Sequence, residues 1–290
     1  MNSRLALGTA QFGFRYGIAN RSGQISRDAV AEILNESWGM GLDTLDTAIV
    51  YGEGEKVLGE IGVREWRVIT KLPAIPDDCT DVSGWVIASV RGSLNRLKLT
   101  RLGGLLLHSP GQLLSEHGDA LHKTLMALKS DGVIEKLGVS IYAPEELAAL
   151  QPRFQFDLVQ APFNVIDRRL YSSGWLTRLH RAGIEIHVRS VFLQGLLLMD
   201  SALRPTQFRR WQPLWDRWHQ WLAAQNLTAV QGCLGFAMSQ SEISRVVVGV
   251  DSLAHLREIL ASTEHPRVMA PEALVSDDLD LINPSRWKTL

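Results

Sequence analysis

The sequence is short of cysteine, of long apolar stretches and of excess charge. Among its 290 residues, Cys79 and Cys233 are the two cysteines, and they form neither a disulfide framework nor a metal-ligand pattern. Apolar runs fall far short of the ~20 residues that a spanning helix needs, and MNSRLALGTAQFG has no signal-peptide pattern. A net charge of −1 argues against a non-specific grip on nucleic acid or an anionic membrane. We therefore expect a cytoplasmic protein that has no metal site and binds neither nucleic acid nor membranes.

The chain also lacks linker-like segments, low-complexity stretches and fixed-period repeats that would divide it. Its 290 residues exceed the usual domain size, but α/β barrels routinely reach this length as one unit. A chain of this size buries enough surface to need no disulfide for stability. We therefore expect a single domain over residues 1–290.

Short apolar runs alternate with longer amphipathic runs. The predicted strands lie at 5–10, 42–46, 67–72, 103–108, 136–140, 156–161, 184–190 and 245–250. The predicted helices lie at 27–40, 53–61, 82–97, 118–131, 144–150, 172–182 and 252–261. Continuous apolar strands are typical of a sheet that is covered on both faces. The alternation predicts the α/β class, with eight parallel strands closed into a (β/α)8 TIM barrel.

A further helix is predicted at 209–225, in an insertion after the seventh strand. Its helical spacing puts one apolar face together from Trp211, Leu214, Trp215, Trp218, Trp221 and Leu222. This pattern favours an amphipathic helix packed on the barrel over a stacking platform for bases or sugars, because no basic groove accompanies it. Its position still allows it to border a ligand.

Titratable side chains stand at the ends of three consecutive predicted strands. Asp46 ends the second strand, with Tyr51 just beyond it, Lys71 ends the third, and His108 ends the fourth. Each alone has an ordinary explanation, as a capping carboxylate, a solvated lysine or a structural histidine. Barrel enzymes place their chemistry at this rim, so the convergence favours a shared site.

The chemistry of these four side chains suits proton donation to a carbonyl group. A phenol has a reference pKa of about 10, and a neighbouring ammonium favours the phenolate, which makes Tyr51 a better acid. Asp46 would hold Lys71 charged and oriented, and His108 could orient a carbonyl oxygen. The four residues therefore predict a general-acid site for a carbonyl that receives a hydride.

The sequence resembles the aldo-keto reductase superfamily over nearly its whole length. The segments that carry the resemblance are, in order, LGTAQFG, LDTAIVYGEGEKVLGE, VITKL, LLLHSP, KLGVSIYAPEEL and VQAPFNVIDR. It implies a TIM barrel that binds NADPH, or less often NADH, without a Rossmann domain, and the chain indeed contains no G-x-G-x-x-G. The family tetrad matches Asp46, Tyr51, Lys71 and His108. Tyr51 would then protonate the carbonyl oxygen, and Lys71 would lower the pKa of Tyr51.

The cofactor contacts that the resemblance implies match less completely. Ser140 and Gln160 match two residues that hold the nicotinamide carboxamide, and Ile141 stands where an asparagine is common. Arg189 takes the place of a tyrosine that stacks on the nicotinamide, and its planar guanidinium can also stack. The residues that match the pyrophosphate loop are Ser190, Leu193 and Gly195.

The motif after the eighth strand departs most from the family. Gly249 stands where the family has a basic residue for the 2′-phosphate of NADPH. Further candidate contacts in this region are Ser252, Arg257 and Glu258. A buried phosphate dianion needs paired charge, which Arg257 could supply and Asp251 would oppose. NADPH and NADH both stay open, and the family's habit slightly favours NADPH.

The resemblance also bears on the barrel floor and on partners. Leu5 already lies in the first barrel strand, so the floor hairpin of many members would be absent or shortened. Either other residues cover the floor or the floor is thinner. The expected partner is a small carbonyl substrate, and a monomer is the family's common state.

Three functions remain in view. The main one is an NAD(P)H-dependent reductase of aldehydes or ketones. The alternative is a regulatory protein that binds the nicotinamide cofactor with weak or no turnover, which Ile141, Arg189 and Gly249 motivate and the intact tetrad disfavours. An enzyme acting on phosphosugars is disfavoured, because no glycine-rich phosphate loop follows the seventh strand.

Overall fold

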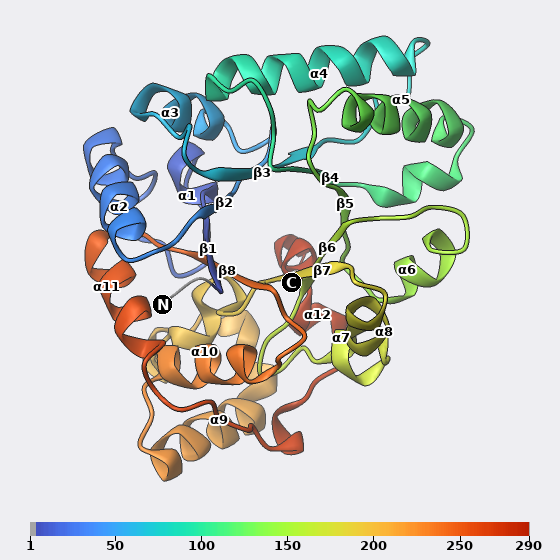
Figure 1. Ribbon diagram of the computed structural model, residues 1–290. Coiled ribbons are helices and arrows are strands. Elements are labelled where there is room, and N and C mark those ends of the chain that lie inside the picture. Colours follow the sequence, from blue (N-terminus) through green and yellow to red (C-terminus); the bar gives the residue numbers. More distant parts are fainter. Residues whose placement is uncertain (1–3, 290) are drawn as a thin grey trace.

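The computed structural model describes residues 4–289, and its eight parallel strands close into a barrel. Each strand pairs with the next in chain order, and β8 pairs with β1. The strands are β1 (Leu5–Gly8), β2 (Thr44–Asp46), β3 (Arg67–Leu72), β4 (Gly104–Leu107), β5 (Leu137–Ser140), β6 (Leu158–Pro162), β7 (Glu185–Arg189) and β8 (Arg245–Gly249). Figure 1, which looks roughly along the barrel, shows the helices as an outer ring around these strands. The predicted (β/α)8 TIM barrel is confirmed.

The helices fall largely where the sequence predicts them. They are α1 (Ala10–Gly13), α2 (Arg27–Gly39), α3 (Gly54–Ile61), α4 (Val82–Leu97), α5 (Gly118–Ser130), α6 (Glu145–Leu150), α7 (Arg169–Ser172), α8 (Trp175–Arg181), α9 (Gln212–Gln225), α10 (Ala229–Ser239), α11 (Leu253–Ser262) and α12 (Leu279–Ile282). Six 3-10 helices lie at η1 (Pro110–Leu114), η2 (Leu193–Leu198), η3 (Ser201–Leu203), η4 (Thr206–Trp211), η5 (Glu272–Leu274) and η6 (Pro284–Thr289). Of the helices within residues 4–289, none has the length and apolar character to cross a membrane.

Four helices escaped the sequence prediction, for two reasons. α1, α7 and α12 have only four residues each, too few to show a periodic pattern. α10, with the sequence AVQGCLGFAMS, is buried on nearly all sides and therefore shows no apolar stripe of helical period. It is the helix that connects the insertion to β8.

The tryptophan-rich helix α9 packs on the molecule as predicted. Trp215 and Trp218 are fully buried, and their indole nitrogens donate to the carbonyl oxygens of Phe208 (2.9 Å) and Leu197 (3.1 Å). Each buried indole thus has both apolar cover and a hydrogen-bond acceptor. The segment is a structural one, and it does not line the cavity described below.

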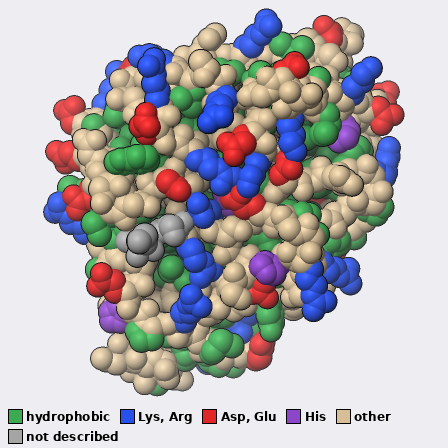
Figure 2. Space-filling model, in the orientation of Figure 1, with side chains coloured by type: hydrophobic (Ala, Val, Ile, Leu, Met, Phe, Trp, Pro, Cys, Tyr) green, Lys and Arg blue, Asp and Glu red, His purple; other side chains and the backbone are tan. Residues whose placement is uncertain are grey.

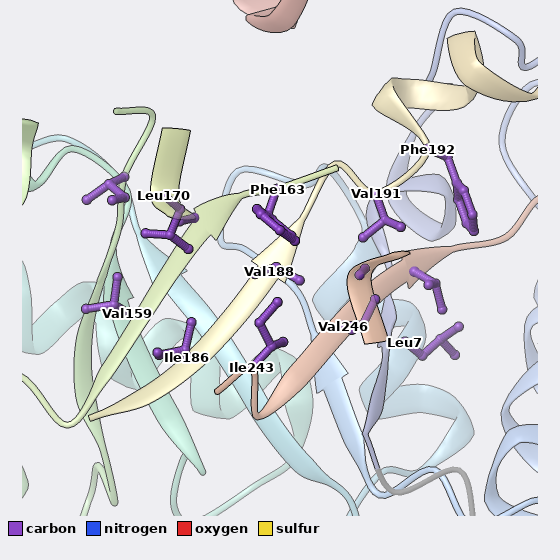
Figure 3. Packing of buried hydrophobic residues seen from close by; sticks show 14 of the residues in the cluster. Leu7, Val159, Phe163, Leu170, Ile186, Val188, Val191, Phe192, Ile243 and Val246 are labelled. Atoms are coloured by element: carbon purple, nitrogen blue, oxygen red, sulfur yellow. The ribbon is translucent and has the colours of Figure 1, made fainter. Parts of the chain in front are cut away.

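Strand side chains alternate between the barrel interior and the surrounding helices. The outward-facing residues join one large apolar core, and Figure 3 shows part of it, with Ile186 and Val188 of β7 beside Val246 of β8. Inside the barrel, Ile69, Leu106 and Leu158 form a separate small apolar cluster. This cluster divides the interior into two polar ends.

The polar end at the start of the strands is closed by charged side chains. Glu185 accepts hydrogen bonds from Arg67 Nη1 (2.7 Å) and Nη2 (3.0 Å), lies 2.7 Å from His187 Nε2, and pairs with Lys136. Burial works against the charged form, but the hydrogen bonds with His187, Arg67 and Lys136 hold the pKa of Glu185 well below its ordinary value. We call these four residues the floor network.

The floor network spans the barrel at its base. Arg67 comes from β3, Lys136 directly precedes β5, and Glu185 and His187 come from β7. Figure 2 shows basic and acidic side chains gathered near the middle of the visible face. Ion pairs of the floor network, which cross the barrel at its base, therefore cover the floor.

Candidate active site

A cavity of about 580 Å³ opens at the carboxyl ends of the strands. Asp46 and Tyr51 lie at one end of it, next to the barrel axis. It continues past the segments that follow β1 and β7, at 8–11 and 189–195, and reaches α11 at His255 and Glu258. Its volume lies within the range of small-molecule and cofactor sites.

A buried ion pair forms the base of the cavity's inner end. Lys71 Nζ donates to Asp46 Oδ2 at 2.7 Å and to the carbonyl oxygen of Thr47 at 2.8 Å, and the Lys71 and Asp46 side chains are 1% and 6% exposed. Asp46 Oδ1 accepts from Gln160 Nε2 at 2.6 Å. Burial lowers the pKa of Lys71, while the charge of Asp46 opposes that shift. The pair fixes a cation directly beneath the cavity.

Tyr51 stands between this ion pair and the cavity. Its ring centroid lies 5.2 Å from Lys71 Nζ and 6.3 Å from the ring of His108. Within residues 4–289 its hydroxyl has no hydrogen-bond partner, so it is available to a ligand. The structure thus brings all four predicted tetrad residues, Asp46, Tyr51, Lys71 and His108, together.

The pKa of Tyr51 moves in the opposite direction to the one predicted. Burial raises it, and the negative charge of Asp46 raises it further. The sequence pattern shows the neighbouring cation, but the ion pair offsets the charge of Lys71 and burial penalises the phenolate. With its pKa raised, the hydroxyl of Tyr51 is protonated at neutral pH.

Glycines fix the position of the Tyr51 turn. A Cβ atom on Gly13 of α1 would lie 1.7 Å from the carbonyl oxygen of Tyr51, and one on Gly52 would lie 2.6 Å from the carbonyl oxygen of Gly13. Gly52 also has φ +53, which glycine adopts without strain. Only hydrogen atoms fit between these two segments, so α1 and the Tyr51 turn are in direct backbone contact. The motifs LGTAQFG and YGEG contain both glycines, but the pattern alone gives Gly13 no role.

His108 follows β4 and stays neutral. Burial, together with the positive charges of Lys71 and Arg189, lowers its pKa to about 4. A neutral imidazole has one nitrogen that donates and one that accepts. His108 can therefore bond a carbonyl oxygen without carrying charge.

Arg189 ends β7 and lines the cavity beside Tyr51. Its Nη2 donates to the carbonyl oxygen of Ile141 at 3.0 Å, and its guanidinium lies 4.7 Å from the ring centroid of Tyr142. Tyr142, which the sequence analysis passed over, thus supports the guanidinium plane. Arg189 is the one Lys or Arg among the described residues that line the cavity.

The other predicted cofactor residues lie in four different settings. The cavity is lined by Ser190, Gly195, Gly249 and Glu258. Ser140 and Gln160 are buried beneath it and joined by a hydrogen bond of 3.4 Å, whereas Leu193 belongs to the apolar core. Ser252 caps α11 by accepting from the backbone N–H of His255.

Arg257 lies away from the cavity. Its guanidinium faces α2 and pairs with Glu36 at 2.9 and 3.2 Å. A phosphate in the cavity would therefore gain no charge from it, and the idea that it replaces the missing cation at Gly249 has no structural support. The residues that do reach this end of the cavity include Gln11, Asn20 and Asp251, of which the sequence analysis had weighed only Asp251.

The loop after β7 has an unusual backbone and lines the cavity. Ser190, Leu193, Gln194 and Gly195 have φ values of 61°, 48°, 53° and 88°, and strained backbone of this kind is concentrated at functional sites. The N–H groups of Leu193 and Gly195 donate within the loop, to the carbonyl oxygens of Ser190 and Phe192 at 2.9 Å, so they hold the turn together. The volume of the cavity and its lining by Ser190 and Gly195 fit a dinucleotide.

The barrel carries a cavity and an Asp–Tyr–Lys–His set at its carboxyl rim. The model of the Aldo/keto reductase family matches residues 4–271. The chain belongs to this family, and the resemblance of its sequence motifs is confirmed.

Individual relatives are distant but cover most of the chain. An uncharacterized oxidoreductase of Bacillus subtilis (strain 168), YqkF, is 23% identical over 287 residues, which is 92% of either chain. A putative aldo-keto reductase structure from Pseudomonas aeruginosa has a TM-score of 0.66 at 23% identity, with 89% of each chain covered. The holo form of an aldo-keto reductase from Bacillus halodurans has a TM-score of 0.74 at 17% identity, covering 95% of this chain and 94% of that one. These structures support the fold.

Proposed function

We propose that this chain is an NAD(P)H-dependent oxidoreductase that reduces an aldehyde or ketone to an alcohol. The observation that carries the proposal is Tyr51. Its hydroxyl faces the cavity without a protein partner, and its ring lies 5.2 Å from a lysine that is bound to a buried aspartate. A structural tyrosine with this degree of burial would normally satisfy its hydroxyl within the protein.

Each residue of the site has a role in the proposed reaction. Tyr51 gives its proton to the carbonyl oxygen as that oxygen gains negative charge. Lys71 stabilises the phenolate that remains, and Asp46 holds Lys71 at the required place. Neutral His108 orients the carbonyl oxygen by a hydrogen bond.

A nicotinamide cofactor, when bound, supplies the hydride for this reaction. The chain would hold it with Ser190 and Gly195 along the pyrophosphate and with Ser140 and Gln160 near the carboxamide. Arg189 is placed to lie against the ring.

The test is turnover by the purified protein. We expect NADH or NADPH absorbance at 340 nm, the wavelength at which reduced nicotinamide absorbs, to fall when a panel of aldehydes such as nitrobenzaldehydes is added. The matched control omits the carbonyl compound and measures slow oxidation alone. Cofactor binding without turnover on any carbonyl would contradict the proposal and favour the regulatory alternative. That alternative is motivated by buried, apolar Ile141 at the carboxamide position.

A further inference from the structure

The far end of the cavity carries negative charge. Asp251 and Glu258 line it together with His255, while Arg189 lies at the opposite end beside Tyr51. Glu258 is solvent-exposed and Asp251 is half-buried, and both line the cavity. Any ligand that runs the length of the cavity must place its outer end among these side chains.

Asp251 is held in place by a buried amide. Asn20, which is 3% exposed, donates from Nδ2 to Asp251 Oδ1 at 3.1 Å. The same amide binds the backbone of Gly23, donating to its carbonyl oxygen at 3.0 Å and accepting from its N–H at 2.8 Å. The carboxylate is therefore preorganised, and it would have to break a buried hydrogen bond to turn away from a ligand.

The two positions from which a cation could reach this end do not provide one. A Cβ atom on Gly249 would meet the side chain of Gln11 at 2.6 Å, so an uncharged amide fills that space. The guanidinium of Arg257 is committed to Glu36 on the other side of α11. Among residues 4–289, Arg15 is nearby, but it donates to the carbonyl oxygen of Asn20 at 3.2 Å and does not line the cavity. His255 does line it, and a histidine is a weak and pH-dependent source of positive charge.

On the basis of the proposed function, we propose that Asp251 and Glu258 make this end of the cavity selective for NADH over NADPH. Carboxylates accept hydrogen bonds from the hydroxyl groups of a ribose, and an acidic residue serves this purpose in other dinucleotide sites. A 2′-phosphate would place a second dianion beside two carboxylates without a paired cation, and such like-charge contacts are costly.

The experiment measures the dissociation constants of NADH and NADPH by equilibrium titration, with quenching of tryptophan fluorescence as the readout. We expect the wild-type protein to bind NADH at least about tenfold more tightly, a preference that corresponds to about 1.4 kcal/mol. In the double variant Asp251→Asn/Glu258→Gln, NADPH should bind more tightly and the ratio of the two constants should approach one. The control Asp131→Asn/Glu135→Gln makes the same charge change in the exposed turn between α5 and β5 and should keep the wild-type ratio.

A second measurement needs no variant. Salt screens repulsion between charges near the surface, so the ratio should narrow as ionic strength rises. Equal or tighter binding of NADPH by the wild type, or a ratio that neither salt nor the double variant changes, would overturn the inference while leaving the reductase intact. Binding of neither cofactor would instead overturn the proposed function, and the inference with it.

Discussion

Both ends of the barrel interior contain ion pairs between buried charged residues, but the two sets of residues differ in what they leave exposed to a ligand. At the floor, Glu185 is surrounded by Arg67, Lys136 and His187. At the rim, Lys71 has Asp46 and a carbonyl oxygen as partners, and the hydroxyl of Tyr51 faces the cavity unbonded. The carboxylate of Glu185 is fully paired at the floor, although Arg67 Nε and His187 Nδ1 of the same network lack a partner among the described residues. An unsatisfied polar group beside a buried charge therefore occurs at both ends, and what distinguishes the rim is that its unbonded group, the hydroxyl of Tyr51, belongs to a residue that lines the cavity.

The most direct test of this contrast is to remove the hydroxyl group of Tyr51. Tyr51→Phe should lower kcat/KM for carbonyl reduction by about 10²- to 10⁴-fold, the usual contribution of a positioned proton donor. Because the hydroxyl makes no bond within the described chain, the thermal unfolding midpoint should stay the same. The matched control Tyr171→Phe alters an exposed tyrosine on α7 and should change neither quantity. A large loss of stability in Tyr51→Phe would mean that the rim is structural like the floor.

The floor should show the reverse behaviour. Glu185→Gln removes the negative charge that pairs with Arg67 and Lys136, while His187, whose pKa burial lowers, is a neutral partner. We expect the variant to lower the free energy of unfolding by about 2–4 kcal/mol at neutral pH, with little change in activity per folded molecule. Denaturant titration measures the first quantity. The exposed control Asp131→Asn should be close to the wild type.

The pH dependence of the same variant gives a signed test. Since the folded-state pKa of Glu185 is depressed, its contribution is present above its ordinary pKa of about 4.3 and is lost as the pH falls through the folded-state pKa. The difference in stability between wild type and Glu185→Gln should therefore narrow below about pH 4. A constant difference down to pH 2 would show that the carboxylate charge is not what the floor uses.

A smaller effect is expected at Arg189, whose charge lowers the pKa of both Tyr51 and His108. Arg189→Met should raise both pKa values and reduce kcat/KM by about tenfold, equivalent to about 1.4 kcal/mol. Arg189→Lys keeps the charge but loses the plane that lies over Tyr142. If the two variants behave alike, stacking is the role of Arg189, whereas a milder loss in Arg189→Lys assigns the role to charge.

The smallest effect is the one expected for His108 between pH 5.5 and 8. With its pKa lowered to about 4, it remains neutral over this range, so kcat/KM should show no inflection near pH 6.5 that is due to His108. Comparing the pH profiles of the wild type and His108→Gln measures this. An inflection that disappears in the variant would show that His108 is more exposed to water than the structure indicates.

The sequence predicts the barrel and the tetrad because both follow from local patterns. Asp46, Lys71 and His108 sit at strand ends, and parallel strands bring their ends to one rim without further information. Gly13, Gln11 and Asn20 escape such reasoning because their roles depend on segments that meet only in the folded chain. The predicted direction of the pKa shift of Tyr51 was wrong for a related reason. The sequence pattern shows a neighbouring charge but does not show how deeply the side chain is buried.

Arg257 and Glu258 show that a shift of one position along a helix decides which charged side chain faces a cavity. Adjacent residues point about 100° apart around the helix axis. Glu258 therefore lines the cavity while Arg257 faces α2. Without the rotation of α11 about its axis, the sequence cannot decide which of the two charges a ligand meets. The monomeric state, the cytoplasmic location and the single-domain extent stay predictions.

The alternation of side chains along β3 and β7 limits which mutations these strands can tolerate. Arg67 and Lys71 share one face of β3, as Glu185 and Arg189 share one face of β7, with the apolar middle of the barrel between them. Loss or gain of a single codon within either strand would turn residues on one side of the change outward, so the floor and the rim could not both remain inside. Substitutions can change the residues of the floor or of the rim separately. An insertion or deletion in β3 or β7 would require the residues at both ends of the barrel to change at the same time.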